Sequence, residues 1–148
     1  MSFKNILVAV DESAQASAAL DLAIDLAKAV GAALTIVHAV DPALVASVAV
    51  DAAAAAATME IEMDELQAAG KELLEGAVAH ARAAGLAATS TLLDGVPAPA
   101  ILETARRAGC DLIAIGTHGR HGLARVFLGS CAEAVVREST VPVLIKRS

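Results

Sequence analysis

The sequence Gly116-Thr-His-Gly-Arg-His-Gly-Leu-Ala-Arg-Val-Phe-Leu-Gly-Ser130 lies between a largely apolar run at 111–115 and a segment at 131–137 with helical character. The apolar run is typical of a buried strand. Three glycines at three-residue intervals, at 116, 119 and 122, let the backbone bend and approach a ligand where a Cβ atom would clash. Gly129-Ser130 then begins a helix, and the N–H groups at a helix start bind anions. Ser130 with Glu133 also matches a capping box. The two interpretations are compatible, since a capped helix still directs its other N–H groups outward.

The rest of the chain alternates apolar runs with helical segments. Asp11-Glu-Ser13 supplies N-cap candidates for the first helix, and Gly31, Gly85 and Gly109 each stand where a helix should end. This order predicts an α/β fold: one domain with a five-stranded parallel sheet, helices on both faces and a Rossmann-like arrangement. The strands are expected at 6–10, 34–40, 87–93, 111–115 and 143–146.

A long helix is expected before the third strand, because apolar residues recur there at helical spacing. Gly70 lies on the same stripe, where the lack of a side chain permits close packing but weakens the helix. The Ala/Val-rich segment 43–58 fits either a mobile loop or an early helical turn. The residues of the stripe are Met59, Met63, Leu66, Leu73, Ala77 and Ala81.

Three features follow strands and should therefore meet at the carboxyl edge of the sheet. They are Asp11 after the first strand, 39–41 after the second, and Gly116 after the fourth. Ligands of open parallel sheets bind at this edge, at the point where the strand order reverses. The glycine-rich stretch thus lies where a ligand is expected.

Composition excludes several classes of function. Aromatic residues make up 1% of the chain, which leaves no stacking platform for single strands, and a net charge of −6 disfavours nucleic acid as a partner. Cys110 and Cys131 form no disulfide framework or metal motif and suit a reducing cytoplasm. The segment 43–59 is Ala-rich and carries Asp51, which would cost about 2.5–3.5 kcal/mol in a bilayer, so no membrane association is expected.

The phosphate motif is neither a Walker loop, which needs Gly-Lys-Ser/Thr, nor the dinucleotide fingerprint, which follows a first strand. Its spacing is Gly116-x2-Gly119-x9-Gly129-Ser130. Together with Lys-Asn-Ile-Leu-Val-Ala-Val-Asp-Glu-Ser near the N-terminus, His38-Ala-Val-Asp41, Gly95-Val-Pro97 and Val141-Pro-Val-Leu-Ile, this pattern resembles the universal stress protein family over essentially the whole length. In that family the motif marks the members that bind ATP.

The resemblance implies a set of binding roles. Asp11 would hold the ribose or lie beside the adenine, Ala9 and Val10 would line the pocket, and the backbone of Ala39 would contact the adenine edge. Arg120 would add positive charge, and Mg²⁺ would be held mainly by the phosphates. The phosphates would receive N–H groups from Gly116, Gly119, Gly129, Ser130 and Cys131, with the Ser130 hydroxyl.

The resemblance also implies a cytoplasmic homodimer, paired through the apolar edge strand Val141–Lys146, that acts as a sensor or regulator in the stress response. No pattern supplies a general base with a nucleophile, so no catalytic residues and at most slow ATP hydrolysis are expected. The alternatives are a nucleotide-dependent enzyme, either an ATPase or a nucleotidyl transferase, and a structural dimer with an empty pocket. Two positions depart from the family: Cys131, usually valine or another small residue, and His121, usually glycine or a small polar residue.

Several residues admit a second interpretation. His118 and His121 have a spacing that could hold a metal, although no carboxylate or cysteine pattern joins them and solvent-facing side chains are favoured. His38 is favoured as a hydrogen-bonded structural residue. Asp11 could serve only as a helix cap. Cys131 at a helix start could have a lowered thiol pKa and a redox role, although a small packed residue is favoured.

Overall fold

The computed structural model describes residues 2–42, 52–117 and 128–147. Strands and helices alternate along the chain, and each expected strand lies within two residues of its predicted bounds. Of the segment 43–58, for which a loop and an early helical turn were both open, the part from Ala52 onward is helical, and residues 43–51 lie outside the described residues. In chain order the elements are β1 (Asn5–Ala9), α1 (Ala14–Val30), β2 (Ala33–Val40), α3 (Ala52–Ala83), β3 (Ala88–Asp94), α4 (Pro97–Arg107), β4 (Leu112–Gly116), α5 (Ser130–Glu138) and β5 (Val143–Lys146).

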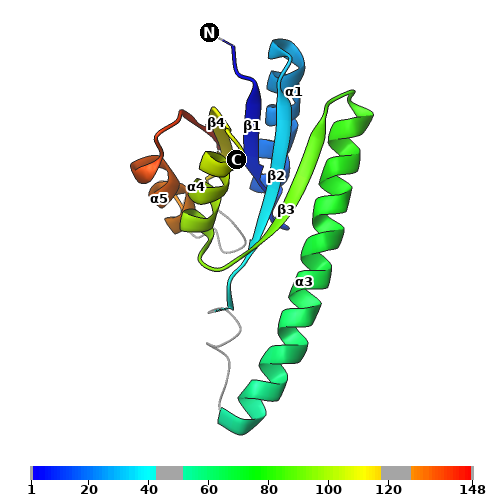
Figure 1. The fold of residues 1–148 in the computed structure, drawn as a ribbon, viewed down its shortest axis with the longest axis vertical. Helices are drawn as coiled ribbons and strands as arrows, with labels where there is room; N and C mark the ends of the chain where they lie inside the picture. Colours follow the sequence, from blue (N-terminus) through cyan, green and yellow to red (C-terminus); the bar gives the residue numbers. More distant parts are fainter. Residues whose placement is uncertain (1, 43–51, 118–127, 148) are drawn as a thin grey trace.

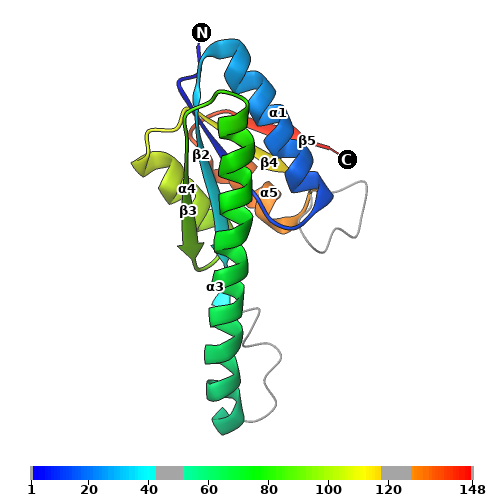
Figure 2. The same cartoon turned by 90° about the vertical axis from the view of Figure 1, so that its right-hand side faces the viewer.

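The five strands form one parallel sheet in the order β3-β2-β1-β4-β5. The chain builds outward from β1 to β2 and β3, and then returns to the other side of β1 to add β4 and β5 (Figures 1 and 2). The strand order therefore reverses between β1 and β4. This arrangement confirms the predicted fold class.

Helices cover both faces of the sheet, as Figure 2 shows for α1 and α3 on one side and α4 with α5 on the other. Each face has its own apolar core, because residues on a buried parallel strand point alternately to the two sides. In β1, Ile6 and Val8 belong to the core under α1 and α3, whereas Leu7 belongs to the core under α4 and α5. Alanines form most of the buried face of α1, which lets this helix lie close to the sheet: Ala16, Ala19, Ala23 and Ala27.

Glycines end the helices as predicted. The backbone of Gly31 is left-handed, with φ of 76°, and its N–H donates to the carbonyl of Ala27. Side chains rarely adopt this conformation, so glycine suits the position. Gly85 and Gly109 also have positive φ, each two residues after the last residue of α3 and α4. At the start of α4, Pro97 occupies the first turn, where a missing N–H does no harm.

Helix α3 is much longer than the strands on which it packs. Its 32 residues span about 48 Å, and its first part extends beyond the carboxyl edge of the sheet (Figures 1 and 2). Its last three turns bury Leu74, Ala77, Val78 and Ala81 against the sheet. In the part of the chain that the structure describes, no helix is both long and apolar enough to span a membrane.

Candidate functional site

The reversal of strand order places the ends of β1 and β4 side by side at the carboxyl edge. The paired residues Val8 and Ala114 lie near the ends of their strands. The segments that follow β1 and β4 therefore begin next to each other. Val10 is buried and donates its N–H to the Val37 carbonyl, and Ala39 is half-buried near the end of β2. Ala9, Val10, Asp11, Ala39 and Gly116 thus share the edge at which ligands of such sheets bind.

The turn from β1 into α1 is closed by its own side chains. The Asp11 carboxylate accepts the N–H of Ser13 at 2.7 Å, and the Ser13 hydroxyl accepts the N–H of Ala16 at 3.1 Å. Ser13 is therefore the N-cap of α1. Asp11 does not cap the helix directly but holds the capping residue in place. The alternative that Asp11 is the helix cap is wrong.

Gly116 is needed for the packing of α1 against the end of β4. A Cβ atom there would lie 2.9 Å from the carbonyl carbon of Gln15, in the first turn of α1. This glycine therefore lets the start of α1 lie against the end of β4, whatever else binds nearby. The sequence pattern suggested that this glycine makes room for a ligand, whereas in the structure it makes room for the first turn of helix α1.

The two ends of the glycine-rich stretch are joined by a short hydrogen bond. Gly129 donates its N–H to the carbonyl of Thr117 at 2.6 Å, and Thr117 is buried, 4% exposed. The N–H of Thr117 donates in turn to Lys146 at the end of β5. These bonds fix Gly129 at the sheet edge. Gly119 and Arg120, with His118 and His121, lie outside the described residues.

Helix α5 begins at this fixed point without a side-chain cap. Its N-cap is Gly129, with extended backbone at φ −62° and ψ 159°, and Ser130 is the first helical residue. The predicted capping box is therefore wrong. The bond to Thr117 holds Gly129 at the N-cap, so Ser130 is the first residue inside the helix and its hydroxyl cannot act as the cap. Glu133 instead approaches Arg137 at 3.4 Å. Because the first N–H groups of a helix have no partner within it, those of Ser130 and Cys131 form a candidate anion site, whereas the N–H of Gly129 is already bonded to Thr117.

Cys131 lies in the first turn of α5, close to Asp11. Burial, and secondarily the negative charge of Asp11, raise the pKa of its thiol to about 11. The thiol is therefore protonated at neutral pH. The alternative of a redox thiolate with a lowered pKa is wrong, because burial outweighs the effect of the helix terminus. The effect of the Asp11 charge is consistent with the turn before α1 and the start of α5 lying at the same edge of the sheet.

His38 is confirmed as a hydrogen-bonded structural residue. It is 8% exposed, and its Nδ1 lies 2.8 Å from the carbonyl oxygen of Val10. Gly70 also behaves as predicted, since a Cβ atom there would lie 2.9 Å from the His38 ring and 2.8 Å from Leu92. Sequence reasoning did not connect the two residues. A glycine on the apolar stripe of a helix, together with a histidine in an otherwise apolar strand, could have indicated this contact.

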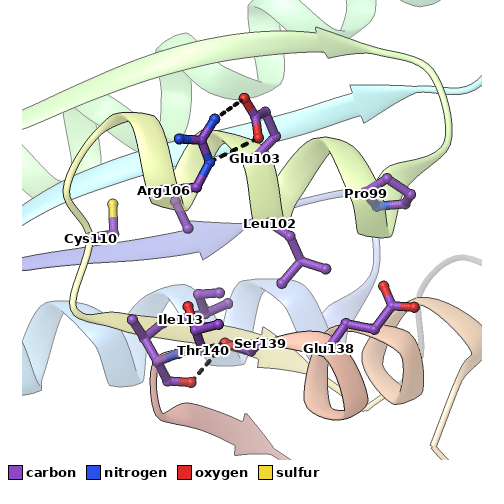
Figure 3. Close-up of a pocket in the computed structure, with 11 residues that line it drawn as sticks. Pro99, Leu102, Glu103, Arg106, Cys110, Ile113, Glu138, Ser139 and Thr140 are labelled. Carbon is purple, nitrogen blue, oxygen red and sulfur yellow. Dashed lines mark hydrogen bonds and ion pairs between the residues drawn. The ribbon is translucent and has the colours of Figure 1, made fainter.

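A separate groove of about 250 Å³ lies between α4 and the segment that joins α5 to β5 (Figure 3). Leu102 points into it from α4, and Ser139 and Thr140 lie on the opposite side. Three of its polar side chains have partners within the protein: Arg106 pairs with Glu103 at 2.6 Å, and Ser139 bonds to Val141. None of the predicted site residues lines this groove. Among the described residues, no group of His, Cys, Asp and Glu could hold a metal ion.

Comparisons with known proteins agree with this architecture. The model of the universal stress protein family matches residues 2–147. The universal stress protein YxiE of Bacillus subtilis is 35% identical, over 98% of this chain and 99% of its own length. Among solved structures, UspA from Lactobacillus plantarum has a TM-score of 0.86 at 26% identity and 99% coverage of both chains.

Two further structures of similar proteins were solved with nucleotides. A universal stress protein in complex with cAMP has a TM-score of 0.73 at 26% identity, covering 99% of this chain and 98% of its own. The universal stress protein from Archaeoglobus fulgidus in complex with dAMP has a TM-score of 0.68 at 26% identity, covering 99% of both chains.

Proposed function

The chain belongs to the universal stress protein family, and we propose that it binds an adenine nucleotide, ATP in particular, at the carboxyl edge of its sheet. The observation that carries this proposal is the uncapped start of α5, fixed by Thr117 at the reversal point of the strand order. Two similar structures with adenine nucleotides support the choice of base.

Each end of the nucleotide has a partner of suitable chemistry. The phosphates accept N–H groups from Ser130 and Cys131 and the hydroxyl of Ser130, which is exposed. Gly119 and Arg120 complete this end, and Mg²⁺ held mainly by the phosphates offsets their charge. Asp11 is an acceptor that suits ribose hydroxyls better than phosphates.

Burial of the adenine must supply part of the affinity. Four hydrogen bonds to a charged group contribute about 6–12 kcal/mol, since each is worth about 1.5–3 kcal/mol. Association costs about 4–15 kcal/mol. Phosphate contacts alone are therefore marginal, which favours a whole nucleotide over free phosphate. Ala9, Val10 and the backbone of Ala39 would supply the adenine site, and the protein would act as a regulator with at most slow hydrolysis.

The proposal is tested by mass spectrometry of small molecules released from the purified protein, followed by thermal unfolding with ATP and Mg²⁺. Ligand at about one hundred times its Kd stabilises by about 2.7 kcal/mol, or about 5–10 °C for a chain of this size. Absence of a retained nucleotide together with an unchanged unfolding temperature would contradict it.

We further propose that two copies pair through β5, the edge strand next to β4. The bonds from Ile113 to Pro142 and from Thr117 to Lys146 show which groups of β5 face β4. By the alternation of a parallel ladder, the N–H of Ile145 faces outward. Ile145→Pro should therefore yield a monomer in analytical ultracentrifugation. Ser90→Pro, which removes an outward N–H from the opposite edge strand β3, is the matched control and should leave the dimer intact.

A further inference from the structure

The imidazole of His38 takes a hydrogen-bonding position that the strand ladder would otherwise fill. Its Nδ1 stands 2.8 Å from the Val10 carbonyl oxygen, and this oxygen only accepts hydrogen bonds. Nδ1 therefore carries the hydrogen and donates it. The ring is buried, so this bond is shielded from water.

The ladder between β1 and β2 shows what the imidazole displaces. The N–H of Ala33 donates to Lys4, just before β1, whereas that of Leu34 donates to Ala87, just before β3, so odd-numbered residues of β2 face β1. The last bond of the ladder joins the N–H of Val10 to the Val37 carbonyl. In a regular parallel ladder, the next bond would run from the N–H of Ala39 to the Val10 carbonyl. The paired register instead ends at Ala9 and Val37.

Helix α3 holds the imidazole in this position from the outer side. Gly70 approaches so closely that a Cβ atom would lie 2.9 Å from the Cδ2 of His38 and 2.8 Å from the Cδ1 of Leu92. The ring is thus confined between a glycine of the helix and the carbonyl at the end of β1. Helix α3, on one face of the sheet, thus helps to hold the hydrogen bond between His38 and Val10 at the carboxyl edge.

We propose that His38 is a positioning residue for the base of the bound nucleotide. By taking the Val10 carbonyl, it parts β1 from β2 one residue early and leaves the N–H and C=O of Ala39 directed at the site. One donor beside one acceptor complements the adjacent acceptor and donor on an adenine edge. This inference rests on the proposed nucleotide binding, and it makes the choice of base depend on a residue that does not touch the base.

Two substitutions separate this role from simple packing. His38→Asn keeps a side-chain N–H close to the place of Nδ1 but loses the ring, whereas His38→Leu keeps most of the volume but has no donor. If His38 only fills space, the leucine variant should be the better replacement in every measurement. If it positions Ala39, the asparagine variant should retain base selection although it leaves a cavity.

Calorimetric titration with ATP and with GTP measures base selection. The wild type should prefer ATP. His38→Leu should lower the affinity for ATP by about tenfold, as expected for one or two lost hydrogen bonds, with the affinity for GTP unchanged within about threefold. His38→Asn should stay close to the wild type for both nucleotides. An equal loss for ATP and GTP in the leucine variant, or a loss as large in the asparagine variant, would overturn the proposal.

Amide hydrogen exchange of the nucleotide-free protein tests the inference without any ligand. The amide of Ala39 should exchange rapidly in the wild type and in His38→Asn. In His38→Leu it should become protected, because the Val10 carbonyl is free to accept it and the ladder closes. If no nucleotide binds the wild type, the proposed function fails, and this measurement still decides the role of His38: unchanged exchange at Ala39 would refute it.

Discussion

Helices α1 and α5 both begin at the carboxyl edge of the sheet, but their first turns differ in chemistry. At α1, the Ser13 hydroxyl accepts the N–H of Ala16, and Asp11 accepts the N–H of Ser13. At α5, the cap is Gly129, which has no side chain to offer. The start of α1 thus has a side-chain cap for one of its N–H groups, whereas the start of α5 has no side-chain cap. Since both helix starts carry the same sign of dipole, the cap residue is what distinguishes them, and it is the reason we propose α5 and not α1 as the anion site.

Helix α4 provides a third case at the same edge. Its cap residue, Val96, makes no side-chain hydrogen bond, so this helix start is also uncapped. Its first turn, however, contains Pro97 and Pro99, which have no N–H to donate. An uncapped helix start is therefore insufficient for an anion site. Only α5, among these three, combines a missing cap with a first turn that retains its donors.

Converting the start of α5 into one like that of α1 should have the largest effect. Gly129→Asp introduces a capping carboxylate at a backbone conformation that any residue adopts. Fold stability should change by only about a few tenths of a kcal/mol. Nucleotide affinity should fall at least about one-hundredfold, since two or more charge-assisted bonds are lost and like charges oppose each other. Calorimetric titration with ATP and thermal unfolding measure the two quantities.

The matched control is Val96→Asp, which places the same charge at the cap of α4. Val96 is 60% exposed, so its replacement removes little packing. ATP should bind this variant as it binds the wild type. A comparable loss of affinity in both variants would mean that any negative charge at this edge weakens binding, and the distinction between α4 and α5 would fail.

The contact between α1 and β4 should have the next largest effect. In Gly116→Ala the new Cβ would lie 2.9 Å from the backbone of Gln15, which cannot yield as a flexible side chain would. We expect a loss of about 1–3 kcal/mol in the free energy of unfolding, measured by urea denaturation. Gly76→Ala on α3 is the control, because nothing lies within 4 Å of its added Cβ. It should stabilise by about 0.5–1 kcal/mol; equal losses in both variants would disprove the steric account.

The hydroxyls of Ser13 and Ser130 should differ in what they support. Ser13→Ala removes the cap of α1 and should cost about 1 kcal/mol of unfolding free energy. Ser130→Ala removes a hydroxyl that caps no helix, so stability should stay within about 0.5 kcal/mol of the wild type. ATP affinity should nevertheless fall in Ser130→Ala. A stability loss in Ser130→Ala as large as that in Ser13→Ala would restore the capping box.

The fold was predictable because local signals and sheet pairing agree. Buried parallel strands require continuous apolar runs, and glycines such as Gly31 mark helix ends through their backbone conformation. The position of a cap is a different problem. Ser130 and Glu133 have the spacing of a capping box, but the bond from Gly129 to Thr117 sets the actual start of α5. That bond connects the residue after β4 to the N-cap of α5, and the spacing of residues in the sequence does not predict such a contact.

Site chemistry was less predictable, because it depends on neighbours from distant parts of the chain. The helix terminus suggested a lowered thiol pKa at Cys131, but burial and Asp11 reverse the shift. His38 was expected to be hydrogen-bonded, yet neither its partner Val10 nor its contact with Gly70 follows from periodicity. Gly119 and Arg120 remain predictions.

The smallest expected effect concerns Cys131, whose thiol reports on the space between the two helix starts. Its pKa of about 11 lies above the ordinary value of about 8.5. The folded state therefore favours the neutral thiol, and the stability it contributes is complete below about pH 8.5 and is lost as pH rises through 11. Alkylation of Cys131 by iodoacetamide, followed by peptide mapping to separate it from Cys110, should accelerate only as pH approaches 11 and should slow when ATP binds. Rapid alkylation at pH 7 would mean that Asp11 and the packing around α5 do not shield this thiol.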